Sequence, residues 1–269
     1  MADSDKVFAG SIPGLYDRYL GPLLFEPYAQ DMARRLADLK EGRLLEIAAG
    51  TGIVTRALDR ALPPAVAIVA TDLNQAMLDH AMTQLRSARV QWQQADALAL
   101  PFKEGEFDAV VCQFGVMFFP DKRQAFQEAL RVLKPRGRYL FNVWDSLEEN
   151  EVSLTVTDAV AGCFPGNPPQ FLRRAPHGYH DVATIRRDLE AAGFGANKVE
   201  TLPKQSRASS PRDPAIGFCQ GSPLRNEIEA RDPKRLTEVT ETATKAVAAR
   251  FGNGPITCKL QAIVFEARK

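Results

Sequence analysis

The stretch that decides the fold reads Leu44-Leu45-Glu46-Ile47-Ala48-Ala49-Gly50-Thr51-Gly52. Its apolar residues predict a buried strand over 44–49, and its two glycines predict a sharp turn into a helix over 53–62. A strand, a glycine-rich turn and a helix together build a cofactor pocket. The glycine backbone lets a ligand come close, and the first turn of the helix offers free N–H groups.

Glu46 indicates which cofactor the turn binds. The residue is an acid at the end of the strand, before Gly50 and Gly52. A carboxylate there repels a pyrophosphate, whereas it attracts a ligand with a cationic ammonium or sulfonium group. The residue therefore favours S-adenosylmethionine (SAM) over a dinucleotide.

Apolar runs and amphipathic stretches alternate downstream of this unit. Further strands are predicted over 66–71, 89–94, 107–113 and 138–144, and further helices over 75–86 and 122–133. Continuous apolar strands that alternate with helices predict an α/β fold, a parallel sheet with helices on both faces.

The chain divides into four predicted parts. Residues 1–40 are expected to form an N-terminal helical cap, and 41–204 the cofactor-binding core, which includes helices over 150–162 and 182–192 and a strand near 197–202. Residues 205–254 are predicted as a helical lid insertion, whose main helix begins at Asp232-Pro233 and ends at Gly252. A last strand, about 257–266, closes the sheet within the part 255–269.

SAM carries an amino-acid tail, a sulfonium, a ribose diol and an adenine, and the strand ends offer partners for them in order. Asp72 follows the second strand, where its two oxygens can accept both ribose hydroxyls. Asp96 follows the third, where it can accept from the adenine amine while the Ala97 N–H donates to a ring nitrogen. Leu73 and Met77 are placed to sandwich the purine.

Residues 40–145 resemble the core of the class I (Rossmann-like) SAM-dependent methyltransferases, in particular the ubiquinone/menaquinone-biosynthesis type and other small-molecule enzymes. The resemblance rests on the segments 44–52, 71–74, 96–97, 107–119 and 133–137. It implies a seven-stranded, mostly parallel sheet with an antiparallel last strand. It also implies that Ala48 and Gln113 line the methionine end of the cofactor, that Glu46 acts there through hydrogen bonds, and that Tyr16 covers the cofactor tail. Ala48 stands where the family often has its first glycine.

Methyl transfer from a sulfonium is an in-line displacement, so the protein acts mainly by positioning the acceptor. A base is useful only where the acceptor must lose a proton, and His177 and His180 are the candidates for it. The run Phe114-Gly115-Val116-Met117-Phe118-Phe119 is predicted to wall the acceptor site, although these residues can equally be buried core. If they face the site, the acceptor is a small apolar or aromatic molecule.

Composition restricts the binding partners and the cellular location that are expected for this protein. The net charge of +1 lends no support to a nucleic-acid partner, and no apolar run approaches the ~20 residues that span a bilayer. The N-terminus has no secretory signal pattern, and the four scattered cysteines predict neither a disulfide framework nor a metal site. These features predict a cytoplasmic protein with a small-molecule substrate.

Three other functions remain open. An NAD-type oxidoreductase is disfavoured because Thr55 stands where a third glycine would fall and because Glu46 precedes the turn. A non-catalytic SAM-binding scaffold of the same fold would carry the same motifs. A nucleic-acid methyltransferase is a weaker possibility, since the fourth strand ends in Gln113-Phe114-Gly115-Val116 and not in an Asn/Asp-Pro-Pro-aromatic motif.

Overall fold

The structure is a computed structural model that describes residues 5, 8 and 10–269. The chain forms two compact units. Unit 1 comprises residues 1–27, 144–178 and 203–261, and unit 2 comprises 28–143, 179–202 and 262–269. Among the described residues, no helix is long and apolar enough to cross a membrane.

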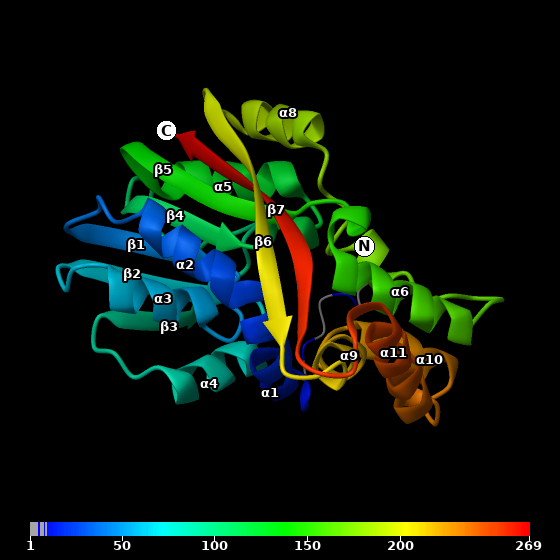
Figure 1. The fold of residues 1–269 in the computed structure, drawn as a ribbon. Coiled ribbons are helices and arrows are strands. Elements are labelled where there is room, and N and C mark those ends of the chain that lie inside the picture. The colour runs from blue at the N-terminus through cyan, green and yellow to red at the C-terminus, as the bar shows by residue number, and fades with distance from the viewer. Residues whose placement is uncertain (1–4, 6–7, 9) are drawn as a thin grey trace. The chain divides into compact units, whose positions relative to one another are not determined.

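Seven strands form one sheet in the order β3-β2-β1-β4-β5-β7-β6 (Figure 1). The strands are β1 (Gly42–Ile47), β2 (Val66–Asp72), β3 (Val90–Gln94), β4 (Phe107–Gln113), β5 (Leu133–Trp144), β6 (Asn197–Ala208) and β7 (Ile256–Arg268). The number of strands agrees with the predicted seven-stranded Rossmann-like sheet.

The first five strands are parallel, and β7 runs against β5. In β1, Leu45 lies opposite Val69 of β2 and Val110 of β4. The amide of Lys269 donates to the carbonyl of Gly137 at 3.0 Å, which pairs the end of β7 with the early part of β5. Because parallel strands end at the same edge, the sheet brings the C-terminal ends of β1, β2 and β4 together.

The helices of unit 2 cover both faces of the sheet. Figure 1 shows α2 and α3 on one face and α5 on the other. The helices are α2 (Glu26–Arg35), which begins just before the unit, α3 (Ile53–Ala61), α4 (Gln75–Gln84), α5 (Lys122–Val132) and α8 (Val182–Ala192). Asp121 and Asp181 cap α5 and α8 by accepting the amides of Gln124 and Thr184, as N-cap aspartates do.

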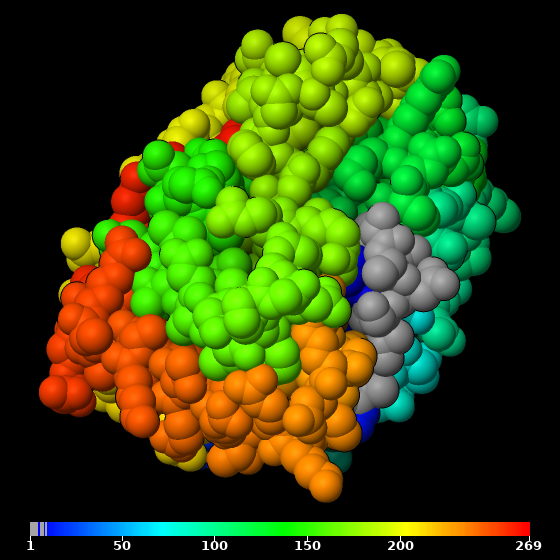
Figure 2. Space-filling view, turned by 90° about the vertical axis from the view of Figure 1, so that its right-hand side faces the viewer, coloured from blue at the N-terminus to red at the C-terminus, as the bar shows by residue number. Residues whose placement is uncertain are grey.

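Unit 1 is mainly helical. Its elements are α1 (Ile12–Leu15), a π-helical segment (Tyr16–Phe25), α6 (Glu151–Cys163), α7 (Phe171–Arg174), α9 (Arg212–Gln220), α10 (Leu224–Arg231) and α11 (Leu236–Phe251). Figure 2 shows the surfaces of α6 and of α10 and α11 side by side, and α6 packs directly on α11. Helices α9 to α11 therefore occupy most of the stretch predicted as a helical insertion.

Three predicted boundaries were wrong by three residues or more. Strand β5 begins at Leu133 and not at 138, because a bulge between Phe107 and Ala109 lets the strand pass Pro135 with Arg136 at a φ of 68°. Strand β6 continues to Ala208 and not to 202; its side chains alternate in exposure, as suits the edge of a sheet. Helix α11 begins at Leu236, three residues after the predicted start, because Asp232 forms a turn with the amide of Lys234.

Aromatic side chains fill the core of unit 2 between the sheet and α5. The rings of Phe141 and Phe265 stack at 4.9 Å with 4° between their planes, which joins β5 to β7. Phe126 of α5 lies 5.4 Å from Phe141, and Tyr139 lies 4.9 Å from it. All four residues are at most 1% exposed, so this cluster anchors the antiparallel strand to the parallel part of the sheet.

Candidate cofactor site

The turn between β1 and α3 has the geometry of a ligand-binding loop. Ala48, Gly50 and Gly52 have φ values of 57°, 56° and 79°, in the left-handed region. A side chain at Gly52 would lie 2.8 Å from the ring of Trp92 and 3.1 Å from Ala81. Glycine is therefore required at position 52 both for its φ and for the close packing of the turn against α4 and β3.

Ala48 stands where the family often has a glycine, and Gly115 leaves room for its methyl group. A Cβ at Gly115 would lie 2.6 Å from the Cβ of Ala48 and 2.6 Å from the Sγ of Cys112. The space left by Gly115 thus holds the methyl group of Ala48. The left-handed backbone of Ala48 still carries strain, because its Cβ approaches the following carbonyl.

Ala48→Gly is expected to raise the free energy of unfolding by about 1 kcal/mol, since glycine adopts a φ of 57° without that strain. Urea denaturation at neutral pH measures the change. Ala49→Gly is the matched control, because Ala49 is buried and its φ is negative, and this variant is expected to lose stability. Equal losses in both variants would contradict the strain at Ala48.

Glu46 is buried at 1% exposure and does not face solvent. Its Oε2 accepts a hydrogen bond of 2.6 Å from the hydroxyl of Thr55, and its carbonyl accepts one of 2.9 Å from the hydroxyl of Thr71. Burial raises the pKa of the Glu46 carboxyl to about 8, and the nearby negative charge of Asp72 acts in the same direction. A cation bound beside Glu46 would favour its ionised form.

Asp72 ends β2 and is 8% exposed. Its Oδ2 accepts the amide of Gly50 at 2.8 Å, and its Oδ1 accepts the amide of Asn74 at 2.8 Å. Burial raises its pKa, while the hydrogen bonds from these amides oppose the rise. Each carboxylate oxygen can accept a second hydrogen bond, so Asp72 can still bind a diol while it braces the glycine turn.

The two apolar candidates differ in their surroundings. Leu73 is 46% exposed, a high value for a leucine at the end of a buried strand. Met77 is 4% exposed, and its Cε lies 3.6 Å from where a side chain on Gly50 would begin. Leu73 offers an open apolar surface at the strand end, whereas Met77 packs beneath the turn.

Asp96 and Ala97 follow β3 in a tight turn. The Oδ1 of Asp96 accepts the amide of Leu98 at 2.9 Å, and the carbonyl of Asp96 accepts the amide of Ala99 at 3.1 Å. Asp96 is exposed, while Ala97 is buried. Asp96 thus forms a turn, and its carboxylate stays accessible to a ligand.

Gln113 ends β4 opposite Asn142 of β5. The next residue, Phe114, has a φ of 52°, and its amide donates to the Oδ1 of Asn142 at 3.0 Å and to the carbonyl of Asn142 at 3.2 Å. Sequence reasoning missed both Asn142 and Thr55, which hold neighbouring parts of the site. A buried polar residue inside an apolar strand, such as Asn142, is the signal that could have revealed one of them.

The remaining predicted residues are Tyr16, His177 and His180. Tyr16 and His177 belong to unit 1, where the ring of Tyr16 stacks on Phe25 at 4.8 Å and His177 is buried. His180 belongs to unit 2, is partly exposed and directly precedes α8. Unit 2 by itself brings together Glu46, Ala48, Gly50, Gly52, Asp72, Leu73, Met77 and Gln113 around the ends of β1, β2 and β4, with Asp96 and Ala97 after the adjacent β3.

This arrangement suits a ligand with one cationic end and one hydroxylated, partly apolar end. Buried carboxyl groups stand at Glu46 and Asp72, and Leu73 adds an exposed apolar surface. Among the residues that the structure describes, no group of three or more histidine, cysteine or acidic side chains has the arrangement of a metal site.

Known proteins are similar to this chain in sequence and in fold. The family described as "Methyltransferase domain" matches residues 45–141. The "Ubiquinone/menaquinone biosynthesis C-methyltransferase UbiE" of Saccharophagus degradans is 37% identical over 183 residues, 62% of this chain and 73% of that protein. The UbiE of Pseudomonas paraeruginosa is 40% identical over 110 residues. This match spans 39% of this chain and 43% of that protein, so the chain covers less than half of that relative's length.

Among solved structures, the phosphoethanolamine N-methyltransferase 2 of Haemonchus contortus, in complex with SAM, has a TM-score of 0.61 at 18% identity. The match covers 96% of this chain and 56% of the other. At this identity the likeness concerns the fold alone. With the match to the Saccharophagus enzyme over most of its length, the chain belongs to the class I (Rossmann-like) SAM-dependent methyltransferases, a family whose cofactor is SAM.

Proposed function

We propose that this protein transfers the methyl group of SAM to a small apolar or aromatic acceptor by in-line displacement. The observation that carries the proposal is the group of buried carboxyls, Glu46 and Asp72, beside a turn with three left-handed residues. SAM supplies the reactive methyl, and the protein holds the acceptor in line with the leaving sulfur and excludes water.

The roles of the site residues follow from the chemistry of SAM. Asp72 binds the ribose diol, Leu73 covers the adenine, and Asp96 accepts from the adenine amine. Glu46, Ala48 and Gln113 lie at the methionine end. Tyr16 covers the cofactor tail in this proposal, and the helices within 205–254 act as a lid over the acceptor.

The names of the related proteins suggest an acceptor to test first. UbiE proteins are C-methyltransferases of ubiquinone/menaquinone biosynthesis, so hydroquinones are the first candidates. We infer that the protein acts in the cytoplasm on a free small molecule, without a nucleic-acid partner.

The test combines binding and turnover. Calorimetry with SAM and with NAD separates the methyltransferase from an oxidoreductase, and SAM alone is expected to bind. Incubation with methyl-labelled SAM and a panel of hydroquinones, phenols and aliphatic amines is then expected to yield S-adenosylhomocysteine with an aromatic acceptor. SAM binding without turnover on any panel member would favour the non-catalytic scaffold, and binding of NAD alone would refute the proposal.

A further inference from the structure

A cavity of about 520 Å³ lies within unit 2, at the β6 edge of the sheet. It is lined by the first residues of β6, by the last part of β7, by the end of α2 and by α8. Strands β4, β5 and β7 separate β6 from β1 in the sheet, so the cavity is distinct from the cofactor group at the ends of β1, β2 and β4 (Figure 1). Its volume is in the range of sites that bind small molecules.

The acidic side chains of this cavity are already paired. Glu200 and Glu266 line it together with Arg35. Oε2 of Glu200 accepts a hydrogen bond of 2.7 Å from Arg35. Oε1 of Glu266 accepts one of 3.0 Å from Arg268, which follows it in β7. Because each carboxylate has a cationic partner, neither one strongly repels an anion that enters the cavity.

Two cationic side chains of the cavity, Arg186 of α8 and Lys198 of β6, have no such partner. Both are exposed, and within the described part of the chain neither side chain forms a hydrogen bond or an ion pair. They belong to different elements, and the fold places them on the same cavity. Their positive charges are therefore available to an anionic ligand.

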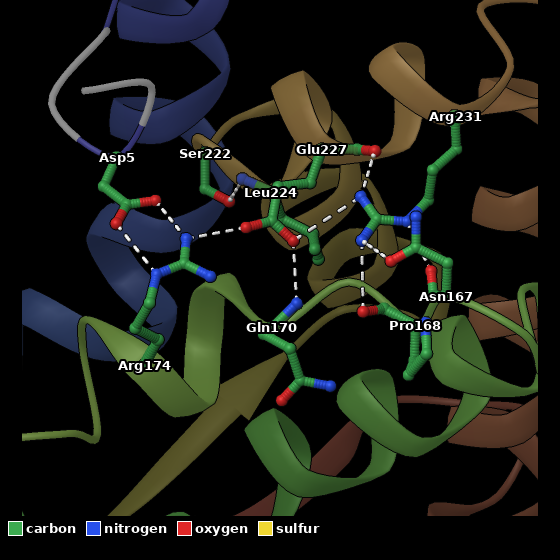
Figure 3. Close-up of polar contacts among 9 residues, drawn as sticks. All are labelled: Asp5, Asn167, Pro168, Gln170, Arg174, Ser222, Leu224, Glu227 and Arg231. Atoms are coloured by element: carbon green, nitrogen blue, oxygen red, sulfur yellow. Dashed lines mark hydrogen bonds and ion pairs between the residues drawn. The ribbon is translucent and has the colours of Figure 1, made fainter. Parts of the chain in front are cut away.

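A pair of cations in unit 1 shows the arrangement that results when the chain supplies the anion itself. Figure 3 shows Glu227 of α10 between Arg174 and Arg231. Its Oε1 lies 2.7 Å from Nη2 of Arg174, and its Oε2 lies 3.8 Å from Nη1 of Arg231. No carboxylate of the described residues pairs with Arg186 or Lys198, so at the unit 2 cavity a dissolved anion can act as Glu227 does here.

Asn197, the first residue of β6, adds a hydrogen-bonding group to the lining. Its Oδ1 is buried and has no hydrogen-bond partner among the residues that the structure describes. A buried acceptor without a donor is unfavourable, so the side chain gains stability when its amide turns toward a hydroxyl in the cavity. The half-buried Val199 and the buried Val264 supply apolar contact beside it.

From this geometry we infer that the cavity binds a small phosphate monoester that carries a free hydroxyl group. Arg186 and Lys198 bind the phosphate, which is close to a dianion at neutral pH and so balances both of their charges. Asn197 accepts a hydrogen bond from the ligand's hydroxyl, and the carbon chain lies against Val264. The inference goes beyond the proposed function, because it gives the protein a second ligand that binds apart from the cofactor.

The test is calorimetric titration of the full chain with glycerol 3-phosphate at physiological ionic strength, with and without S-adenosylhomocysteine. The native protein is expected to bind one equivalent with saturation, and equally well in both conditions. Arg186→Gln and Lys198→Gln are each expected to weaken binding by roughly tenfold or more, since each removes one charge-assisted hydrogen bond.

Arg187→Gln is the matched control. Arg187 is the exposed neighbour of Arg186 on α8, donates to the hydroxyl of Thr184 at 2.9 Å and does not line the cavity. This variant is expected to bind glycerol 3-phosphate as the native protein does. Equal losses in the Arg186 and Arg187 variants would indicate unspecific attraction to surface charge, and native affinity in both would place the phosphate elsewhere; either result overturns the inference.

Two further ligands test the roles of the hydroxyl and of the phosphate. Methyl phosphate has no free hydroxyl on its carbon and is expected to bind more weakly than glycerol 3-phosphate. Asn197→Ala is expected to remove this difference while it leaves the affinity for methyl phosphate unchanged. Glycerate, with a single negative charge, is expected to bind more weakly than glycerol 3-phosphate.

Tighter binding of glycerate would overturn the assignment to a phosphate, and an Asn197→Ala protein with the native preference would overturn the role of Asn197. Absence of saturable binding by the native protein would refute the site as a whole. Competition between glycerol 3-phosphate and S-adenosylhomocysteine would place the anion at the cofactor group and refute it as well. None of these results affects the proposed function, which fails only on its own test with SAM.

Discussion

Asp72→Ala is expected to weaken the binding of SAM by roughly 100-fold or more, because hydrogen bonds from the ribose hydroxyls to a charged acceptor contribute about 1.5–3 kcal/mol each. The variant also removes the acceptor of the Gly50 and Asn74 amides, so the glycine turn loses its brace. Calorimetric titration with SAM measures the change in Kd.

Asp79→Ala is the matched control, since Asp79 is an exposed aspartate on α4 whose carboxylate accepts only from the Gln75 side chain among the bonds described. It is expected to bind SAM as the native protein does. Circular dichroism of the Asp72 variant tests whether the fold persists. A folded Asp72→Ala protein with native affinity would refute the role of Asp72 at the ribose.

Glu46→Gln is expected to stabilise the cofactor-free protein at alkaline pH. The pKa of Glu46 is raised from 4.5 to about 8 by burial, so the folded state keeps a proton that the unfolded state loses. The contribution of the protonated Glu46 to the free energy of unfolding is fully present below pH 4.5 and is lost as the pH rises through 8. The glutamine stays neutral, so the variant avoids that loss, which is roughly 3–5 kcal/mol above pH 8.

Thermal unfolding of the native protein and of Glu46→Gln from pH 4.5 to 9 tests the direction of this pH dependence. The difference in Tm is expected to be small at pH 4.5 and to grow until about pH 8. Glu41→Gln replaces an exposed glutamate just before β1 and is expected to show no such trend. A Tm difference that does not change with pH would mean that Glu46 ionises normally in the folded protein.

Much of the fold follows from local patterns. Strand β4 and helix α8 have the predicted bounds, because each is a short periodic segment between clear start and stop residues. Strand β5 could not be predicted in the same way. Pro135 and Gly137 read as a loop in isolation, and only the pairing with β4 and β7 keeps them within a strand.

The candidate site, like the fold, can be predicted only in part from the sequence. Glu46 and Asp72 can be placed at strand ends from the sequence, since each follows an apolar run that predicts a strand. The burial and the hydrogen bonds of these two residues cannot be predicted from the sequence, because they depend on Thr55, on Gly50 and on the packing of α3 against the sheet. The two histidines 177 and 180 are equivalent in the sequence, and only the structure buries one of them.

The sequence by itself determined the order of strands and helices, the glycine turn and the acids that follow the strands, because these depend on periodicity and on neighbours along the chain. The tertiary structure alone decided which residues share a space. Ala48 replaces a glycine at a left-handed position, and what accommodates its methyl group is the missing side chain of Gly115, 67 residues later. Packing acts through such distant pairs, and no local pattern records them.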